Sequence, residues 1–183
     1  SSRRTVLAPE YDTYDEIFSD IKEGGFNVIH SYQNFNDSSN ELFKFQSAAI
    51  EYNLKVILVP AKNWVYTRKH EITRFIISNK HSETLIAWYI ADEPESYDIP
   101  PAIVKENANF VKNIDQRHIT IAGIGTPAYV SDYIGVSDVL MISSYPINED
   151  YNYRVTAVSD MVDIAIDAMK IRGINQPLWV VLQ

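Results

Sequence analysis

The chain has 183 residues, 46% of them hydrophobic, and a formal net charge of −8. This length suits one domain with a sizeable core, and the acidic balance argues against nucleic-acid binding, which needs a basic surface for the phosphates. No cysteine occurs, which excludes disulfide bonds and thiolate metal sites, and no apolar run approaches the roughly 20 residues of a membrane span.

Short β-like runs alternate with amphipathic helical stretches along the whole chain. Gly24-Gly25 is typical of a helix end and Pro100-Pro101 of a helix start. The predicted helices carry apolar residues at helical spacing and occupy residues 14–22, 40–52, 71–79, 100–114 and 158–173. The predicted strands are apolar and occupy residues 5–8, 26–30, 54–60, 84–91, 118–122, 138–144 and 178–182.

This alternation predicts βαβ units and a parallel sheet, in an α/β fold. Strands of near-continuous apolar character are typical of a sheet that is covered on both faces. An open doubly wound sheet and a barrel both fit the order, but no glycine-rich phosphate loop follows any strand, which argues against a nucleotide-binding sheet and against a nucleotide cofactor. We therefore predict a single (β/α)8 TIM-barrel domain over residues 1–183, incomplete at its C-terminus, with about seven of the eight strands represented.

Polar residues follow several of the predicted strands, which favours the barrel. In a (β/α) barrel the catalytic groups lie at the carboxyl ends of the strands, where the active site is built. The polar and aromatic residues at the predicted strand ends are His30, Asn63, Trp64, Asp92, Glu93, Ser144 and Tyr145.

The most informative segment is Asp92-Glu93-Pro94-Glu95, at the end of the fourth predicted strand. Pro94 has no backbone donor and prevents the strand from continuing, so the turn would project Glu93 at the strand end. Apolar neighbours and a second carboxylate would raise the pKa of one acid, as a general acid near neutral pH requires. The alternative is a solvated acidic turn that caps the next helix; we favour it for Glu95 and a catalytic role for Glu93.

This segment resembles the fourth-strand signature of clan A glycoside hydrolases, in which Asn-Glu-Pro carries the acid/base glutamate. Asp92 stands where those families usually have Asn, so the chain is closer to glycosidase-like barrels with Trp-x-x-x-Asp-Glu-Pro, here residues 88–94. Residues 143–146 and 177–183 resemble those proteins as well. The resemblance implies that two carboxylates hydrolyse a glycosidic bond of an oligo- or polysaccharide, with Glu93 as the general acid/base and Asp92 as a further catalytic candidate.

The resemblance also implies a nucleophilic glutamate at the end of the seventh predicted strand. Gln183 lies near that position and cannot act as a carboxylate nucleophile. Three explanations remain open: the nucleophile lies beyond Gln183, Asp92 assists a water molecule, or the protein is not catalytic. The alternative functions are a carbohydrate-binding protein without hydrolysis and a structural or assembly protein on the same scaffold.

Side chains at the predicted strand ends are also candidates to bind a sugar, because aromatic rings can stack on the apolar faces of sugar rings. Neither His70 nor His81 has a second His or Cys at ligand spacing, so we predict no metal and no cofactor. The expected partner is a carbohydrate substrate, with no nucleic acid and no membrane span; the oligomeric state and the compartment are left open, with an extracellular location favoured. The substrate-binding candidates are His30, Tyr32, Asn63, Trp64, Tyr145, Trp179 and Gln183.

Overall fold

The computed structural model describes residues 13–31, 40–61, 68–144, 147–148, 151–152 and 156–181. Within these ranges, six parallel strands form one sheet in the order β1-β2-β3-β4-β5-β8. A separate antiparallel pair joins β6 (Ile147–Asn148) to β7 (Tyr151–Asn152). The strands of the main sheet are β1 (Val28–His30), β2 (Lys55–Leu58), β3 (Leu85–Asp92), β4 (Ile119–Ile124), β5 (Val139–Ser143) and β8 (Leu178–Val181).

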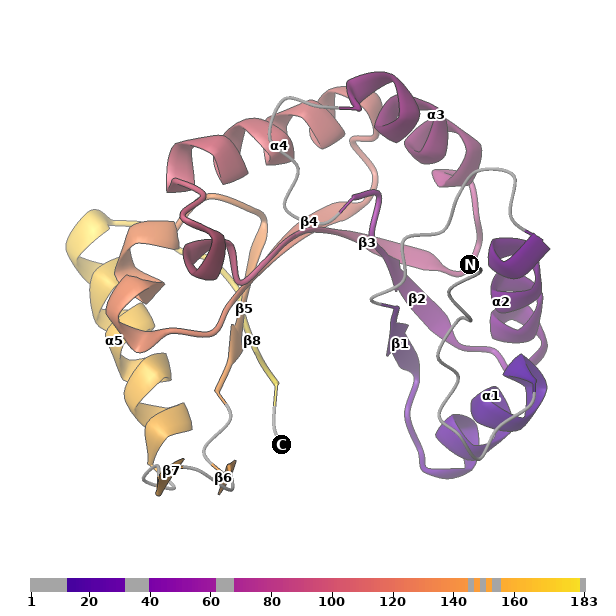
Figure 1. Ribbon diagram of the computed structural model, residues 1–183, viewed down its shortest axis with the longest axis horizontal. Helices are drawn as coiled ribbons and strands as arrows, with labels where there is room; N and C mark the ends of the chain where they lie inside the picture. Colours follow the sequence, from indigo (N-terminus) through magenta and orange to yellow (C-terminus); the bar gives the residue numbers. More distant parts are fainter. Residues whose placement is uncertain are drawn as a thin grey trace.

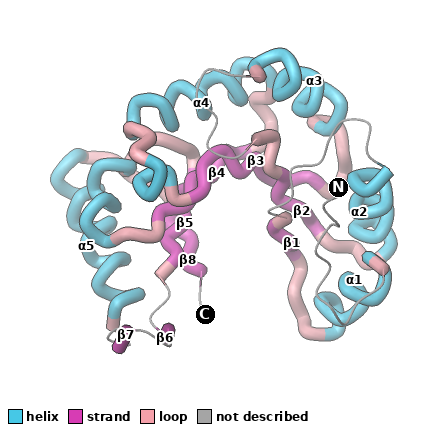
Figure 2. Tube along the Cα trace, in the orientation of Figure 1, coloured by secondary structure: helices cyan, strands magenta, loops and turns pink. Residues whose placement is uncertain are grey.

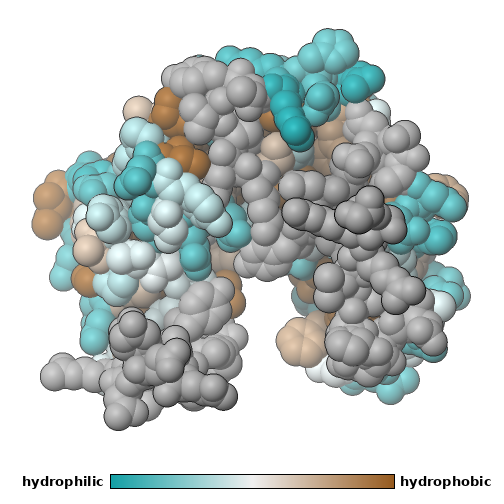
Figure 3. All heavy atoms as spheres, viewed as in Figure 1, coloured by the Kyte–Doolittle hydropathy of each residue, from teal (hydrophilic) through white to brown (hydrophobic). Residues whose placement is uncertain are grey.

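The sheet curves into an arch, and the α-helices lie along its convex side (Figure 1). The tube view shows the same outer layer of helices around the strands (Figure 2). Hydrophilic side chains gather on the outer rim, over α2 and α3 (Figure 3). The helices are α1 (Tyr14–Glu23), α2 (Asn40–Glu51), α3 (Lys69–Asn79), α4 (Pro101–Ile114) and α5 (Ala157–Arg172), with short 3₁₀ helices η1 (Pro94–Tyr97) and η2 (Pro127–Tyr133).

Local sequence accounts for several helix ends. The Thr13 side chain accepts a hydrogen bond from the Glu16 backbone N–H, and the Glu16 side chain accepts one from the Thr13 N–H, which is a reciprocal capping box at the start of α1. Gly173 ends α5 with φ 64°, a left-handed conformation that costs glycine little. The five predicted α-helices are confirmed to within two residues at each end. Within the described ranges, none of the helices is long and apolar enough to cross a membrane.

The predicted (β/α)8 barrel with about seven strands represented is wrong: the described sheet is an open half-barrel of six parallel strands. In the described ranges β1 pairs only with β2, and β8 pairs only with β5, so both are edges of the sheet. A (β/α)8 barrel needs eight strands whose tilt and stagger bring the first and last into hydrogen-bonding contact. The first predicted strand, residues 5–8, lies outside the described residues. The α/β class and the parallel strand order are confirmed.

The curved sheet separates two apolar clusters. The larger cluster lies between the convex side and the helices, and it includes Trp88 and Ile90 of β3. The smaller cluster includes Ala87 and Tyr89 of the same strand, together with residues of β2, β4 and β5 on the concave side. Because all six strands are parallel, their carboxyl ends meet at one edge of the sheet. Side chains at this edge are therefore brought together from segments far apart in the sequence.

Candidate functional site

A β-bulge sets the direction of Asp92 at the end of β3. The pairing of β3 with β4 shifts register between Tyr89 and Ala91, and Asp92 consequently lies opposite Gly123. A bulge adds one residue to a strand and so changes which face the following side chains occupy. Tyr89 belongs to the concave cluster, and its hydroxyl donates a hydrogen bond to Asp92 Oδ1 over 2.9 Å. Asp92 is thus held on the side of the sheet that carries the Tyr89 ring.

Glu93 leaves the strand in a left-handed backbone conformation, with φ 45°. Its backbone N–H still donates to the Gly123 carbonyl over 2.9 Å, so the turn remains fastened to β4. Pro94 then begins η1, as expected from a residue without a backbone donor. A non-glycine residue in this region of φ and ψ carries strain, and such strain is typical of functional sites.

The Glu93 carboxylate reaches across the sheet to β5. The Ser143 hydroxyl, at the carboxyl end of β5, lies 3.4 Å from Glu93 Oε1, and it lies the same distance from the carbonyl oxygen of Ile124. Both contacts are long for hydrogen bonds of a hydroxyl group. The Glu93 carboxylate is therefore held in place by the atoms packed around it more than by a strong hydrogen bond.

Two glycines at the end of β4 make room for these polar groups. A Cβ atom added to Gly123 would lie 2.0 Å from the Tyr89 hydroxyl oxygen, and one added to Gly125 would lie 2.7 Å from Glu93 Oε1. A Cβ atom at either position would force the facing side chain to move. The segment Gly123-Ile124-Gly125 thus provides a backbone surface against which Tyr89 and Glu93 pack.

Glu95 lies in η1 and is buried, with 9% of its surface exposed. Its Oε1 atom accepts hydrogen bonds from the backbone N–H groups of Gly125, over 2.7 Å, and Thr126, over 2.9 Å. The prediction of a solvated acidic turn is therefore wrong for Glu95. Its side chain instead contacts the backbone that follows β4.

The electrostatic environment raises the pKa of the Glu93 carboxyl above its ordinary value. Burial is the largest cause, followed by the negative charges of Asp92 and Glu95, while the Ser143 hydroxyl acts weakly in the opposite direction. Each cause except the last disfavours the ionised form. Glu93 therefore keeps its proton to a higher pH than an exposed glutamate does.

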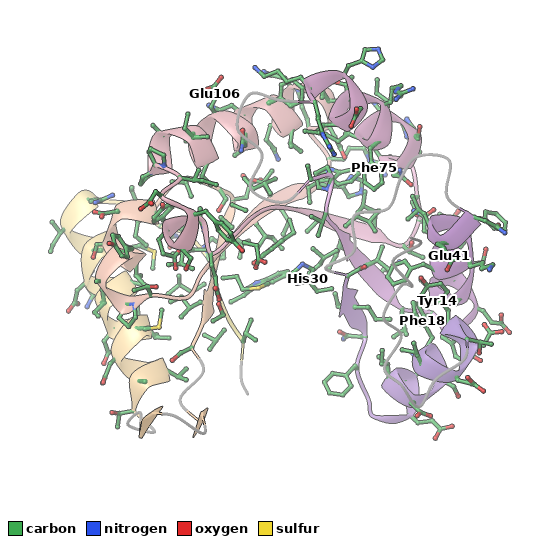
Figure 4. The ribbon with its side chains drawn as sticks, viewed as in Figure 1. Tyr14, Phe18, His30, Glu41, Phe75 and Glu106 are labelled. Carbon is green, nitrogen blue, oxygen red and sulfur yellow. The ribbon has the colours of Figure 1, made fainter. Side chains whose placement is uncertain are left out.

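His30 and Trp179 lie on the same concave side as Tyr89. The His30 ring is 4.3 Å from the Tyr89 ring, centroid to centroid, and Figure 4 shows the His30 side chain on the inner side of the arch. Trp179 on β8 pairs in register with Met141 on β5 and packs against the concave cluster. The structure thus gathers four predicted site residues on one side of the sheet: His30, Asp92, Glu93 and Trp179.

The remaining substrate-binding candidates lie outside the described residues, namely Tyr32, Asn63, Trp64, Tyr145 and Gln183. Sequence reasoning missed Tyr89, Gly123 and Gly125. The available signal was a pair of glycines two residues apart at a strand end, a pattern that indicates close backbone approach. In the ranges that the structure describes, no three His, Cys, Asp or Glu side chains gather in a way that could hold a metal ion.

Comparison with known proteins gives a likeness of fold. No family model matches the sequence, and no curated protein matches it. A GH2 β-galacturonidase from Eisenbergiella tayi, solved with galacturonate, matches with a TM-score of 0.62 and 15% identity, over 92% of this chain and 30% of its own. A β-D-glucuronidase of Dictyoglomus thermophilum matches with a TM-score of 0.60 and 15% identity, over 90% of this chain and 31% of its own.

A β-glucuronidase of Bacteroides uniformis gives a TM-score of 0.60 at 12% identity, over 90% of this chain and 21% of its own. This chain therefore spans between 21% and 31% of the length of these three glycoside hydrolases. At such identities the likeness establishes a shared fold alone. It agrees with the expected resemblance to glycoside hydrolases at that level.

Proposed function

We propose that this chain carries the acid/base part of a glycoside hydrolase site, with Glu93 as the proton donor. The observation that supports this most is the seating of the Glu93 carboxylate at the carboxyl edge of the sheet, in contact with Gly125 and near Ser143. The raised pKa of Glu93 suits a group that must be protonated when the substrate binds. The fold shared with glycoside hydrolases supports the same reaction class.

In the proposed reaction, protonated Glu93 donates its proton to the glycosidic oxygen as the bond between that oxygen and the anomeric carbon breaks. In a single displacement, a water oxygen bonds to the anomeric carbon in the same step, and a second carboxylate takes the proton of that water. In a double displacement, the second carboxylate bonds to the anomeric carbon first, and the Glu93 carboxylate then takes a proton from the water that releases the sugar. Asp92, which precedes Glu93 and accepts a hydrogen bond from the Tyr89 hydroxyl, is one candidate for the second carboxylate, and it would take the proton of the attacking water.

The end of β8 offers a second source for the other carboxylate. Val181 pairs in register with Ser143, the residue nearest to Glu93 on β5. The next two residues, Leu182 and Gln183, are not carboxylates, so in this arrangement the second carboxylate comes from a residue beyond Gln183. Replacing Asp92 with Asn separates the two arrangements, because only the first loses the hydrolytic base.

We further propose a neutral sugar as the substrate. Asp92, Glu93 and Glu95 bring three carboxyl groups to one edge of the sheet. Among the described residues, the hydrogen-bond partners of Glu93 and Glu95 are a serine hydroxyl and backbone amides, and Lys and Arg are not among them. A uronate would bring a further negative charge to this edge and be repelled. This distinguishes the proposal from the β-glucuronidases and the β-galacturonidase that share the fold.

The test is Glu93→Gln in the full chain, assayed on aryl and alkyl glycosides of neutral sugars and on the matching glucuronides. Loss of a general acid is expected to lower kcat/KM by about 10²–10⁴-fold, with the larger loss for alkyl glycosides, whose leaving groups need more protonation. The control is Glu106→Gln, on the outer side of α4 (Figure 4), where the side chain is 48% exposed. Turnover by the Glu93 variant equal to that of the control would refute the proposed role.

A carbohydrate-binding protein without hydrolysis is the second candidate. The concave cluster with Trp179 against it favours this reading, because aromatic rings on such a surface can stack on sugar rings. Saturable binding of a neutral oligosaccharide by calorimetry, weakened by Trp179→Ala and without release of reducing ends, would identify this function.

A further inference from the structure

Glu95 is a buried acid that the proposed proton transfer does not use. Glu95 is buried, with 9% of its surface exposed, and a buried carboxylate is unfavourable unless other groups form hydrogen bonds with it. Two consecutive backbone N–H groups, of Gly125 and Thr126, converge on its Oε1 atom at 2.7 and 2.9 Å. Hydrogen bonds to an ionised acceptor are among the stronger ones in proteins. Glu95 therefore fastens the segment that follows β4 to η1.

The backbone that Glu95 holds is the same backbone that Glu93 contacts. A Cβ atom on Gly125 would lie 2.7 Å from Glu93 Oε1 and 2.9 Å from Glu93 Cδ, so the glycine itself is in close contact with the carboxylate. We propose that Glu95 is a positioning residue, which anchors the Gly125–Thr126 backbone against the Glu93 carboxylate and holds a second negative charge beside it. Its catalytic consequence rests on the proposed function of Glu93; its structural part does not.

The effect of the Glu95 charge on the pKa of Glu93 depends on the groups that surround Glu93. From β3 and η1, the charged groups that face Glu93 are Asp92 and Glu95, and β5 contributes the neutral Ser143 hydroxyl. The other Glu95 oxygen, Oε2, is buried and has no hydrogen-bond donor among the described residues. Hydrogen-bond donors therefore stabilise the Glu95 carboxylate at one oxygen only. Its charge is the third cause of the raised pKa of Glu93, smaller than burial and the charge of Asp92.

The experiment compares Glu95→Gln with Glu95→Ala in the full chain. Glutamine keeps one oxygen that can accept from Gly125 and Thr126 but removes the charge, whereas alanine removes both. The Glu93 side-chain carboxyl is followed by ¹³C NMR as the pH is varied, and its resonance is identified by its loss in Glu93→Gln. Amide hydrogen exchange at Gly125 and Thr126 reports on the anchored backbone.

Glu95→Gln is expected to lower the pKa of Glu93 and to keep the two amides protected. If the proposed function holds, the high-pH limb of the activity profile moves to lower pH by the same amount. Glu95→Ala is expected to increase exchange at both amides by 10-fold or more, on the order expected from the loss of one hydrogen bond. Glu106→Gln is the control and should change none of these quantities.

An unchanged Glu93 titration in Glu95→Gln would overturn the inference, even if Glu95→Ala does not fold. Unchanged exchange at Gly125 and Thr126 in a folded Glu95→Ala would overturn the anchoring. These results are independent of catalysis, because full activity in Glu93→Gln would refute the proposed function while leaving both measurements of Glu95 interpretable.

Discussion

Replacing Asp115 with alanine should destabilise the protein without touching the candidate site. Asp115 lies between α4 and β4, with only 2% of its surface exposed. Its Oδ2 atom accepts a hydrogen bond from Trp88 Nε1 over 2.8 Å and lies 2.7 Å from His118 Nδ1. Its Oδ1 atom accepts the N–H of Arg117 over 3.0 Å. The three contacts join β3 to the start of β4 beneath the helices.

The magnitude follows from what each partner loses. The Trp88 side chain is fully buried, with 0% exposure, so its N–H group would lose its acceptor at a cost of about 2 kcal/mol. His118 is 9% exposed and can recover part of its hydrogen bonding from water, which leaves roughly 1 kcal/mol. Arg117 is exposed, and its N–H can bond to water. The total is about 3 kcal/mol, which in a domain of this size lowers Tm by roughly 6–12 °C.

The assay is urea unfolding of the full chain, followed by circular dichroism at 222 nm, with the slope m compared between variants. The control is Asp167→Ala, an acid that is 69% exposed and paired with Lys170 on the surface of α5, where the expected change is at most about 0.5 kcal/mol. A loss below about 1 kcal/mol for Asp115→Ala would contradict this role of Asp115, since even one buried donor without an acceptor should cost more.

Three further predictions concern the site edge and pH. Gly125→Ala should leave the free energy of unfolding nearly unchanged, because the end of the Glu93 side chain can move away from the new Cβ. The same movement displaces the Glu93 carboxylate by about 1 Å, which should reduce kcat about 100-fold. Gly123→Ala should cost about 1–3 kcal/mol in urea unfolding, because the added Cβ meets the Tyr89 hydroxyl at 2.0 Å on a buried ring, and Tyr89→Phe in the same chain should recover part of that loss. The hydrogen bonds to Asp115 outweigh its burial and lower its pKa. The stabilisation that ionised Asp115 provides is therefore complete above about pH 4, the pKa of an unfolded Asp, and is lost as the pH falls through the lower folded value. The difference in unfolding free energy between wild type and Asp115→Ala should shrink in urea titrations from pH 7 to pH 3.

Trp88 shows that a sequence motif does not indicate on which side of the sheet each of its side chains lies. The sequence pattern from Trp88 to Pro94 carried the resemblance to glycosidase-like barrels, but it assigned no role to Trp88. In the structure the Trp88 ring belongs to the convex core, and its N–H is bound by Asp115, away from the carboxyl edge of the sheet. The aromatic residue at the edge is Tyr89, its neighbour, whose hydroxyl reaches Asp92. Adjacent strand residues face opposite sides, and the pattern alone does not say which side is the site.

The local signals in the chain determined the elements and their order. The apolar spacing in residues 14–22 and the Pro94 that stops β3 act over one or two turns of chain, so the sequence reveals them directly. The open sheet, the bulge that directs Asp92 to the concave side and the close approach of Gly125 to Glu93 arise only in the tertiary structure. These features depend on how neighbouring strands twist and stagger against one another, and on atoms about 30 residues apart meeting at one edge.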